Sequence, residues 1–129
     1  MKARELTQKL LRENGIELIP NNYEPGCWIV YQNGIRRKVC LNTLPRPYGI
    51  DKQYYKVHIS INGVHGGLSL HALVWVYHYG SYAKGYDVSH INDDSYDNRL
   101  ENLECINHLE NIRKKKVKGN KYKNTKTLQ

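Results

Sequence analysis

Residues 86–112, YDVSHINDDSYDNRLENLECINHLENI, constrain the fold more than any other part of the chain. The stretch 86–91 alternates apolar and polar residues, as a half-buried strand does. Residues 92–95, NDDS, have the composition of a turn, and Leu103 to Ile106 suits a short second strand. Asn107 can cap a following helix. The segment therefore predicts a strand, a turn, a second strand and a helix, with the end of the first strand close to the start of the helix.

Upstream of this unit, the pattern predicts a helix followed by a strand-rich region. Residues 3–13 place three leucines (Leu6, Leu10 and Leu11) on one helical face, and Gly15 follows as a stop signal. Residues 16–67 contain apolar and alternating runs typical of strands. Asn33-Gly34 and Asn62-Gly63 are strong hairpin turn signals within this region. We therefore expect antiparallel strands joined by tight turns.

A loop and a second helix complete the expected elements. Pro45 and Pro47 mark a loop between strands. Residues 69–79, SLHALVWVYHY, read as a helix with Ser69 as its N-cap and Gly80 as its stop. Because this helix is apolar nearly all round, we expect it to be buried against the sheet. The predicted fold class is α+β: an N-terminal helix and a small antiparallel sheet, followed by the strand–strand–helix unit and a basic C-terminal tail.

Positive charge is concentrated at the C-terminal end of the chain. The net charge is +8, and residues 113–129, the C-terminal arm, hold eight basic residues and no acidic one. Residues 1–112 carry the other twelve basic residues (20 − 8) and all twelve acidic ones, so their net charge is zero. A like-charge block repels itself and is typical of arms that contact nucleic acid. A solubilising, disordered tail is the alternative.

Cysteine usage and hydropathy favour a cytoplasmic protein without a membrane partner. No apolar run approaches the roughly 20 residues that a membrane span needs. The N-terminal residues MKARELTQKLLRENG lack the apolar core of a signal peptide. Three widely spaced cysteines, Cys27, Cys40 and Cys105, favour reduced thiols over a disulfide framework. No CxxC or CxxH pair is present to seed a zinc site.

The residues Ser89-His90, Asn102-Leu103 and Asn111 resemble the motif of the HNH endonucleases, whose strand–strand–helix core is called the ββα-metal fold. The segments PGCWIV (25–30) and LHALVWVYHYG (70–80) are similar to parts of small phage and intron-associated members, which include homing endonucleases. The resemblance covers about residues 25–112. It implies an N-terminal helix and lead-in (1–24), an HNH-like domain (25–117, with its ββα core at 86–117) and a basic disordered tail (118–129). It also implies a bacterial or phage-infected host cell.

The resemblance assigns catalytic roles to three residues. The histidine that ends the first strand of the family motif is the general base, which implies this role for His90. The middle asparagine orients that base, which implies Asn102, and the residue on the helix ligates a divalent metal, which implies Asn111. An amide oxygen is a hard, neutral ligand suited to Mg²⁺ or Mn²⁺. The implied activity is metal-dependent hydrolysis of phosphodiester bonds in double-stranded DNA.

The position before the base departs from the family pattern. Many members carry an aspartate or a histidine there as a metal ligand, and this chain has Ser89, a weaker ligand. Asp87 shares the strand face of Ser89, but two strand residues span about 6.6 Å, which argues against its reaching the metal. The helix histidine is present as His71, which can brace the site, contact DNA or simply pack.

DNA contact is expected mainly from the C-terminal arm, which continues the metal-bearing helix. Its expected contacts are Arg113, Lys114, Lys115, Lys116 and Lys118. Arg36, Arg37 and Lys38 follow the first hairpin turn and offer a second phosphate contact. Two other functions are open: a DNA-binding protein that keeps the fold but has lost catalysis, which Ser89 favours, and a basic RNA-binding or ribosome-associated protein. The sequence indicates no protein partner.

Overall fold

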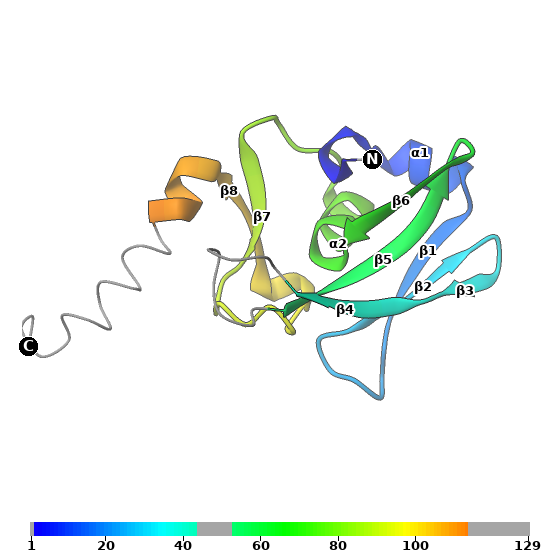
Figure 1. Cartoon of the computed structure of the whole chain (residues 1–129), viewed down its shortest axis with the longest axis horizontal. Helices are drawn as coiled ribbons and strands as arrows, with labels where there is room; N and C mark the ends of the chain where they lie inside the picture. Colours follow the sequence, from blue (N-terminus) through cyan, green and yellow to red (C-terminus); the bar gives the residue numbers. More distant parts are fainter. Residues whose placement is uncertain (1, 44–52, 114–129) are drawn as a thin grey trace, which may run out of the picture.

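The computed structural model describes residues 2–43 and 53–113. These residues form two three-stranded antiparallel sheets, a two-stranded hairpin and the helices between them (Figure 1). The predicted α+β class is confirmed, although the strand-rich region makes two sheets and not one. The loop expected at Pro45 and Pro47 lies outside the described residues. No helix in the described part of the chain is long and apolar enough to cross a membrane.

The N-terminal helix is shorter than the sequence predicts. The expected single helix over residues 3–13 is divided into a 3₁₀ turn, η1 (Ala3–Glu5), and a short α-helix, α1 (Gln8–Glu13). Thr7 lies between them with extended backbone angles, and its side chain accepts a hydrogen bond from the N–H of Leu10. A threonine that caps one helix cannot also continue the preceding turn as part of the same helix.

Each of the two larger sheets is a meander with its strands in chain order. The first contains β1 (Ile16–Pro20), β2 (Trp28–Gln32) and β3 (Ile35–Arg37), and the second contains β4 (Val39–Thr43), β5 (Gln53–Ile61) and β6 (Val64–Ser69). Both predicted Asn-Gly turns are confirmed, and all four turn residues have the positive φ that a type I′ hairpin requires. The turns join β2 to β3 and β5 to β6.

Helix α2 (Leu70–Tyr79) forms the centre of the core, as its apolar sequence predicts. It packs against α1, η1, β5, β6 and β7. Its side chains Leu70, Leu73, Val74 and Val76 are completely buried. The helix ends at Gly80, which has a φ of 96° that favours glycine.

The strand–strand–helix unit forms as the sequence predicts. Strand β7 (Tyr86–His90) pairs antiparallel with β8 (Leu103–Asn107), which follows the 3₁₀ turn η2 (Leu100–Asn102). Residues 108–113 are helical, and the side chain of Asn107 accepts a hydrogen bond from the N–H of Leu109 at 2.9 Å. Figure 1 shows the hairpin beside α2, with the helix of residues 108–113 beyond it (orange). The N–H of His108 donates to the carbonyl oxygen of Gly85 at 2.7 Å, so the helix begins beside the start of β7. Asn111, one turn along the helix, reaches Ser89 near the end of that strand.

Candidate active site

A cavity of about 320 Å³ is lined by residues of α2, β7 and the helix of residues 108–113. His90 and Ser89 line it from β7, Asn111 lines it from the helix, and His71 lines it from α2. Asp87 lies on the same wall as Ser89. The structure thus brings the proposed base and the proposed metal ligands to one cavity, although 21 residues separate His90 from Asn111 in the sequence (111 − 90).

The imidazole of His90 contacts an amide that the sequence analysis did not identify. The Oδ1 atom of Asn98 lies 2.7 Å from Nε2 of His90. An amide oxygen can only accept a hydrogen bond, so with this amide orientation Nε2–H is the donor. The ring of His71 lies at an angle of 60° to that of His90, with the ring centroids 4.7 Å apart.

Asn98 is held in place by the first sheet. Its N–H donates to the carbonyl oxygen of Gly26 at 2.8 Å, and its carbonyl oxygen accepts from the indole Nε1–H of Trp28 at 2.8 Å. Gly26 has a φ of 86°, and a Cβ there would lie 3.2 Å from the Cα of Asp97. Only glycine allows this approach without strain. The GCW segment therefore fixes the residue that contacts His90.

The side chain of Asn98 is 1% exposed, and its hydrogen bonding is incomplete. Its Nδ2 atom is buried and has no hydrogen-bond partner in residues 2–43 and 53–113. Burying an unsatisfied amide donor costs roughly 1–3 kcal/mol. Native proteins keep few such groups, and each one calls for an explanation. Because the unpaired donor lowers stability, we attribute the presence of an asparagine at position 98 to its hydrogen bond with His90.

Asn102 is expected to orient His90, and its side chain is hydrogen-bonded to the loop that follows β7. Its Nδ2 donates to Oδ1 of Asn92 at 2.9 Å and to the carbonyl oxygen of Asp97 at 2.8 Å, while its Oδ1 accepts from the N–H of Asn92 at 3.1 Å. The amide that is hydrogen-bonded to the His90 ring is that of Asn98, four residues earlier (102 − 98). The side-chain hydrogen bonds of Asn102 therefore hold the loop that carries Asn98, and the role of Asn102 in orienting His90 stays a prediction.

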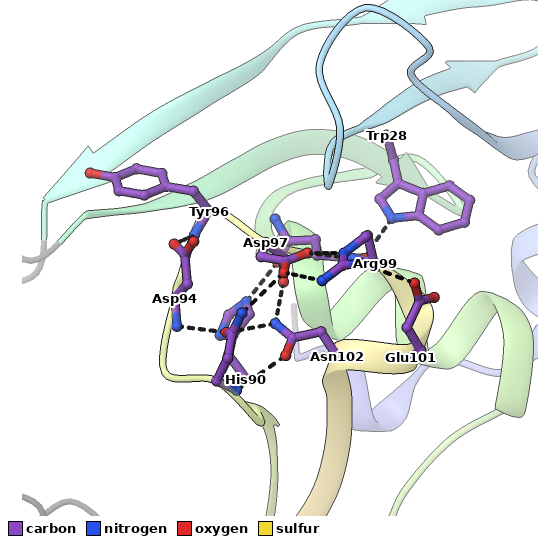
Figure 2. Close-up of polar contacts among 10 residues, drawn as sticks. Trp28, His90, Asp94, Tyr96, Asp97, Arg99, Glu101 and Asn102 are labelled. Atoms are coloured by element: carbon purple, nitrogen blue, oxygen red, sulfur yellow. Dashed lines mark hydrogen bonds and ion pairs between the residues drawn. The ribbon is translucent and has the colours of Figure 1, made fainter.

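An ion pair closes the same loop (Figure 2). Arg99 donates from Nε to Oδ1 of Asp97 and from Nη2 to Oδ2, both at 2.8 Å. These hydrogen bonds lower the pKa of Asp97 to about 2. The carboxylate also accepts from Nδ2 of Asn92 at 3.1 Å. The loop between β7 and β8 is therefore tied together on both sides of Asn98.

The amide of Asn111 bridges Ser89 and Asp87. The hydroxyl of Ser89 donates to Oδ1 of Asn111 at 3.2 Å, and Nδ2 of Asn111 donates to Oδ2 of Asp87 at 3.2 Å. Nδ1 of His108 lies 2.5 Å from the same oxygen of Asp87. Asp87 and Ser89, two residues apart on β7, thus contact the same amide.

The oxygen donors at this end of the cavity fit a hard divalent cation. They are one carboxylate, one hydroxyl and one amide, which are ligand types that Mg²⁺ and Mn²⁺ prefer. Within the described residues, no group of three or more His, Cys, Asp or Glu side chains could hold a metal ion. A cation bound here would therefore depend on the amide and on ligands from water or phosphate.

Little of the expected DNA-contact surface lies within the described residues. Arg113 is exposed at the end of the helix, and the other expected contacts of the arm (Lys114, Lys115, Lys116 and Lys118) lie outside them. Arg36, Arg37 and Lys38 line a second cavity of about 350 Å³ on the first sheet. Cys27, Cys40 and Cys105 are free cysteines in the structure, and burial raises the pKa of the thiols of Cys27 and Cys105.

A protein-family model described as HNH endonuclease matches residues 69–113. No curated protein and no solved structure matches the chain. The matched segment begins at the residue before α2 and ends with the helix of residues 108–113, so it includes His71, Asp87, His90, Asn98 and Asn111. Gly26 and Trp28 lie outside it. Residues 69–113 thus match an HNH endonuclease domain, and the first sheet supports that domain from outside the matched segment.

Proposed function

We propose that this chain is a metal-dependent endonuclease that hydrolyses phosphodiester bonds of double-stranded DNA. The observation that carries the proposal is the convergence of His90, Ser89, Asp87 and Asn111 on one cavity. The match of residues 69–113 to an HNH endonuclease model supports the same reaction class. The likeness to phage and intron-associated members rests on two short segments of sequence and stays a prediction.

His90 is the proposed general base. Its imidazole takes a proton from water, the resulting hydroxide attacks phosphorus, and the bond from phosphorus to the 3′ oxygen breaks. The 3′ oxygen leaves with the bonding electrons and takes a proton from solvent. As the ring becomes positively charged, its Nε2–H bond to Asn98 becomes a charge-assisted one and strengthens. Asn98 is therefore proposed as a positioning residue that also favours the protonated ring.

Asn102 is proposed to position the base indirectly. Its three side-chain hydrogen bonds hold the loop that carries Asn98. Asn111 and Ser89 are the proposed ligands of the divalent cation, Mg²⁺ or Mn²⁺. When bound, the cation supplies Lewis-acid stabilisation of the charge on the scissile phosphate and on the leaving oxygen.

The C-terminal arm is proposed to bind DNA through phosphate contacts. It begins at Arg113, the last residue of the helix that carries Asn111. Basic residues that neutralise phosphates release condensed counterions, so the affinity of such an arm falls steeply with salt. In the sequence, the proposed phosphate contacts directly follow Asn111, which lines the cavity. They are Arg113, Lys114, Lys115, Lys116 and Lys118.

Plasmid cleavage in Mg²⁺ or Mn²⁺ tests the proposed reaction. We expect His90→Ala to lose cleavage by roughly 10²- to 10⁴-fold, the usual contribution of a general base. His58→Ala is the matched control, because His58 is an exposed histidine on β5 that does not line the cavity. Equal nicking by wild type and His90→Ala would defeat the assignment of the base.

One observation favours a second function. Ser89 stands where many family members carry a charged metal ligand, so a DNA-binding protein without catalysis is the alternative. It predicts that the wild-type chain shifts DNA in a gel and leaves it intact in both metals. Cleavage that depends on His90 would exclude this alternative.

A further inference from the structure

We infer that a divalent cation is held between the carboxylate of Asp87 and the amide oxygen of Asn111, and that Ser89 orients Asn111 without ligating the cation. The inference rests on the proposed metal-dependent function, and it replaces Ser89 with Asp87 in the ligand set. Three observations carry it: the distance between Asp87 and Asn111, the hydrogen-bonding capacity of Ser89, and the position of His108.

The distance between Asp87 and Asn111 suits a shared cation. Nδ2 of Asn111 and Oδ2 of Asp87 are 3.2 Å apart. Neighbouring ligands of an octahedral Mg²⁺ at 2.0–2.1 Å are about 3 Å apart. A half-turn of the Asn111 amide would place its oxygen where the nitrogen now lies. In its present orientation the amide pairs its N–H with the carboxylate instead.

Ser89 can support both orientations of that amide. Its hydroxyl now donates to Oδ1 of Asn111 at 3.2 Å. A hydroxyl also accepts hydrogen bonds, so after the half-turn it can accept from Nδ2 without moving. The same hydroxyl would be a neutral and weak ligand, whereas Asp87 supplies the negative charge that a divalent cation requires. The residue next to the base therefore acts on the amide, and the carboxylate two positions earlier binds the cation.

His108 contacts the same carboxylate oxygen of Asp87 and would compete with a cation for it. Its Nδ1 lies 2.5 Å from Oδ2 of Asp87, and its side chain is 56% exposed. An exposed side chain at the first position of a helix can turn into solvent at little cost in packing. His108 is thus a competitor for Asp87, and its removal should make the carboxylate more available to the cation.

Binding of Mn²⁺ to the full chain without DNA, measured by the EPR signal of free Mn²⁺, tests the inference independently of cleavage. We expect Asp87→Asn to weaken Mn²⁺ binding at least tenfold and Ser89→Ala to weaken it less than threefold. His108→Ala should bind Mn²⁺ more tightly than wild type. Glu110→Gln, which removes one exposed carboxylate from the same helix, is the matched control for net charge and should bind as wild type does.

The outcomes separate the ligand assignment from the proposed reaction. Equal losses in Asp87→Asn and Ser89→Ala, or a larger loss in Ser89→Ala, would overturn the assignment of Asp87. Weaker or unchanged binding by His108→Ala would overturn the competition. Circular dichroism shows whether each variant is folded, and Asp87→Glu, which keeps the charge, should retain more binding than Asp87→Asn. Absence of cleavage with the expected binding pattern would defeat the nuclease and leave the cation site standing.

Discussion

The two sides of the candidate active site are held in different ways. On the base side, Asn98 is buried and is clamped by Gly26 and by Trp28, which is 70 residues away in the sequence. On the cation side, Asp87 and Asn111 have their hydrogen bonds within the strand–strand–helix unit, and the side chain of Asp87 is 34% exposed. The orientation of the base thus depends on the first sheet, whereas the cation ligands can rearrange locally.

This difference suits the two chemical tasks. A general base must keep one ring orientation relative to the attacking water, and an error of about 1 Å can cost on the order of 10²-fold in rate. Cation ligands must exchange partners when the ion and its phosphate arrive. Buried, long-range contacts serve the first task, and exposed, short-range contacts serve the second.

The largest expected effect comes from deleting residues 114–129, which follow the helix of Asn111 in the sequence. The deletion removes seven lysines: Lys114, Lys115, Lys116, Lys118, Lys121, Lys123 and Lys126. We expect DNA affinity at low salt to fall on the order of a thousandfold, with a shallower dependence on salt. Thermal unfolding of the domain should not change. A truncated chain that binds DNA as tightly as the full chain would refute the role of the arm.

Asn98→Ala tests the base side of the site by removing the hydrogen-bond partner of His90. We expect kcat for plasmid cleavage to fall about 100-fold, equivalent to about 2.7 kcal/mol in the barrier, because His90 loses its hydrogen-bond partner. KM for DNA should be unchanged, since Asn98 is buried. Asn98→Asp keeps an acceptor oxygen at the same place and should recover part of the rate. A wild-type kcat in Asn98→Ala would remove Asn98 from the mechanism.

Gly26→Ala tests whether the first sheet supports the base. We expect the free energy of unfolding, measured in urea, to fall by roughly 2–4 kcal/mol from the unfavourable φ and the close backbone of Asp97. Gly63→Ala is the matched control, with a φ of 81° and open space around its Cβ. The free energy of unfolding of Gly63→Ala should fall only by the cost of placing alanine at a positive φ. Equal losses of unfolding free energy in the two variants would show that the close contact between Gly26 and the backbone of Asp97 does not contribute to stability.

Asp97→Asn gives the smallest expected effect, and the effect depends on pH. The folded pKa of Asp97 is about 2, which is below the ordinary value for an aspartate, so its ionised form stabilises the fold. This contribution is present above about pH 4 and is lost as the pH falls toward 2. The urea midpoints of wild type and Asp97→Asn should differ at pH 7 and converge at low pH. A difference that does not change with pH would exclude the ion pair as its cause.

The control for this titration is Glu101→Gln. Glu101 pairs with the same arginine at 3.4 Å, but its side chain is 71% exposed. Because exposed ion pairs contribute little to stability, this variant should shift the midpoint less than Asp97→Asn at pH 7.

The elements that the sequence predicts well are those with local signals. The Asn-Gly turns, helix α2 and the strand–strand–helix unit each depend on residues close in sequence, and the structure contains all of them. The helix over 3–13 was predicted as one element because the leucine spacing continues past Thr7, whose side-chain cap divides it. Leucine periodicity alone does not reveal which threonine turns its hydroxyl back to the helix backbone.

For the candidate site, the amino-acid sequence by itself indicated three of the residues that line the cavity from the strand–strand–helix unit: His90, Ser89 and Asn111. Only the tertiary structure decided their partners. Asn98 contacts His90 because the first sheet holds its backbone, and Asp87 reaches Asn111 because β7 lies against the helix of residues 108–113. Local patterns determine backbone conformation through short-range sterics and hydrogen bonds. The partner of a side chain depends on how distant segments pack, which no short spacing in the sequence encodes.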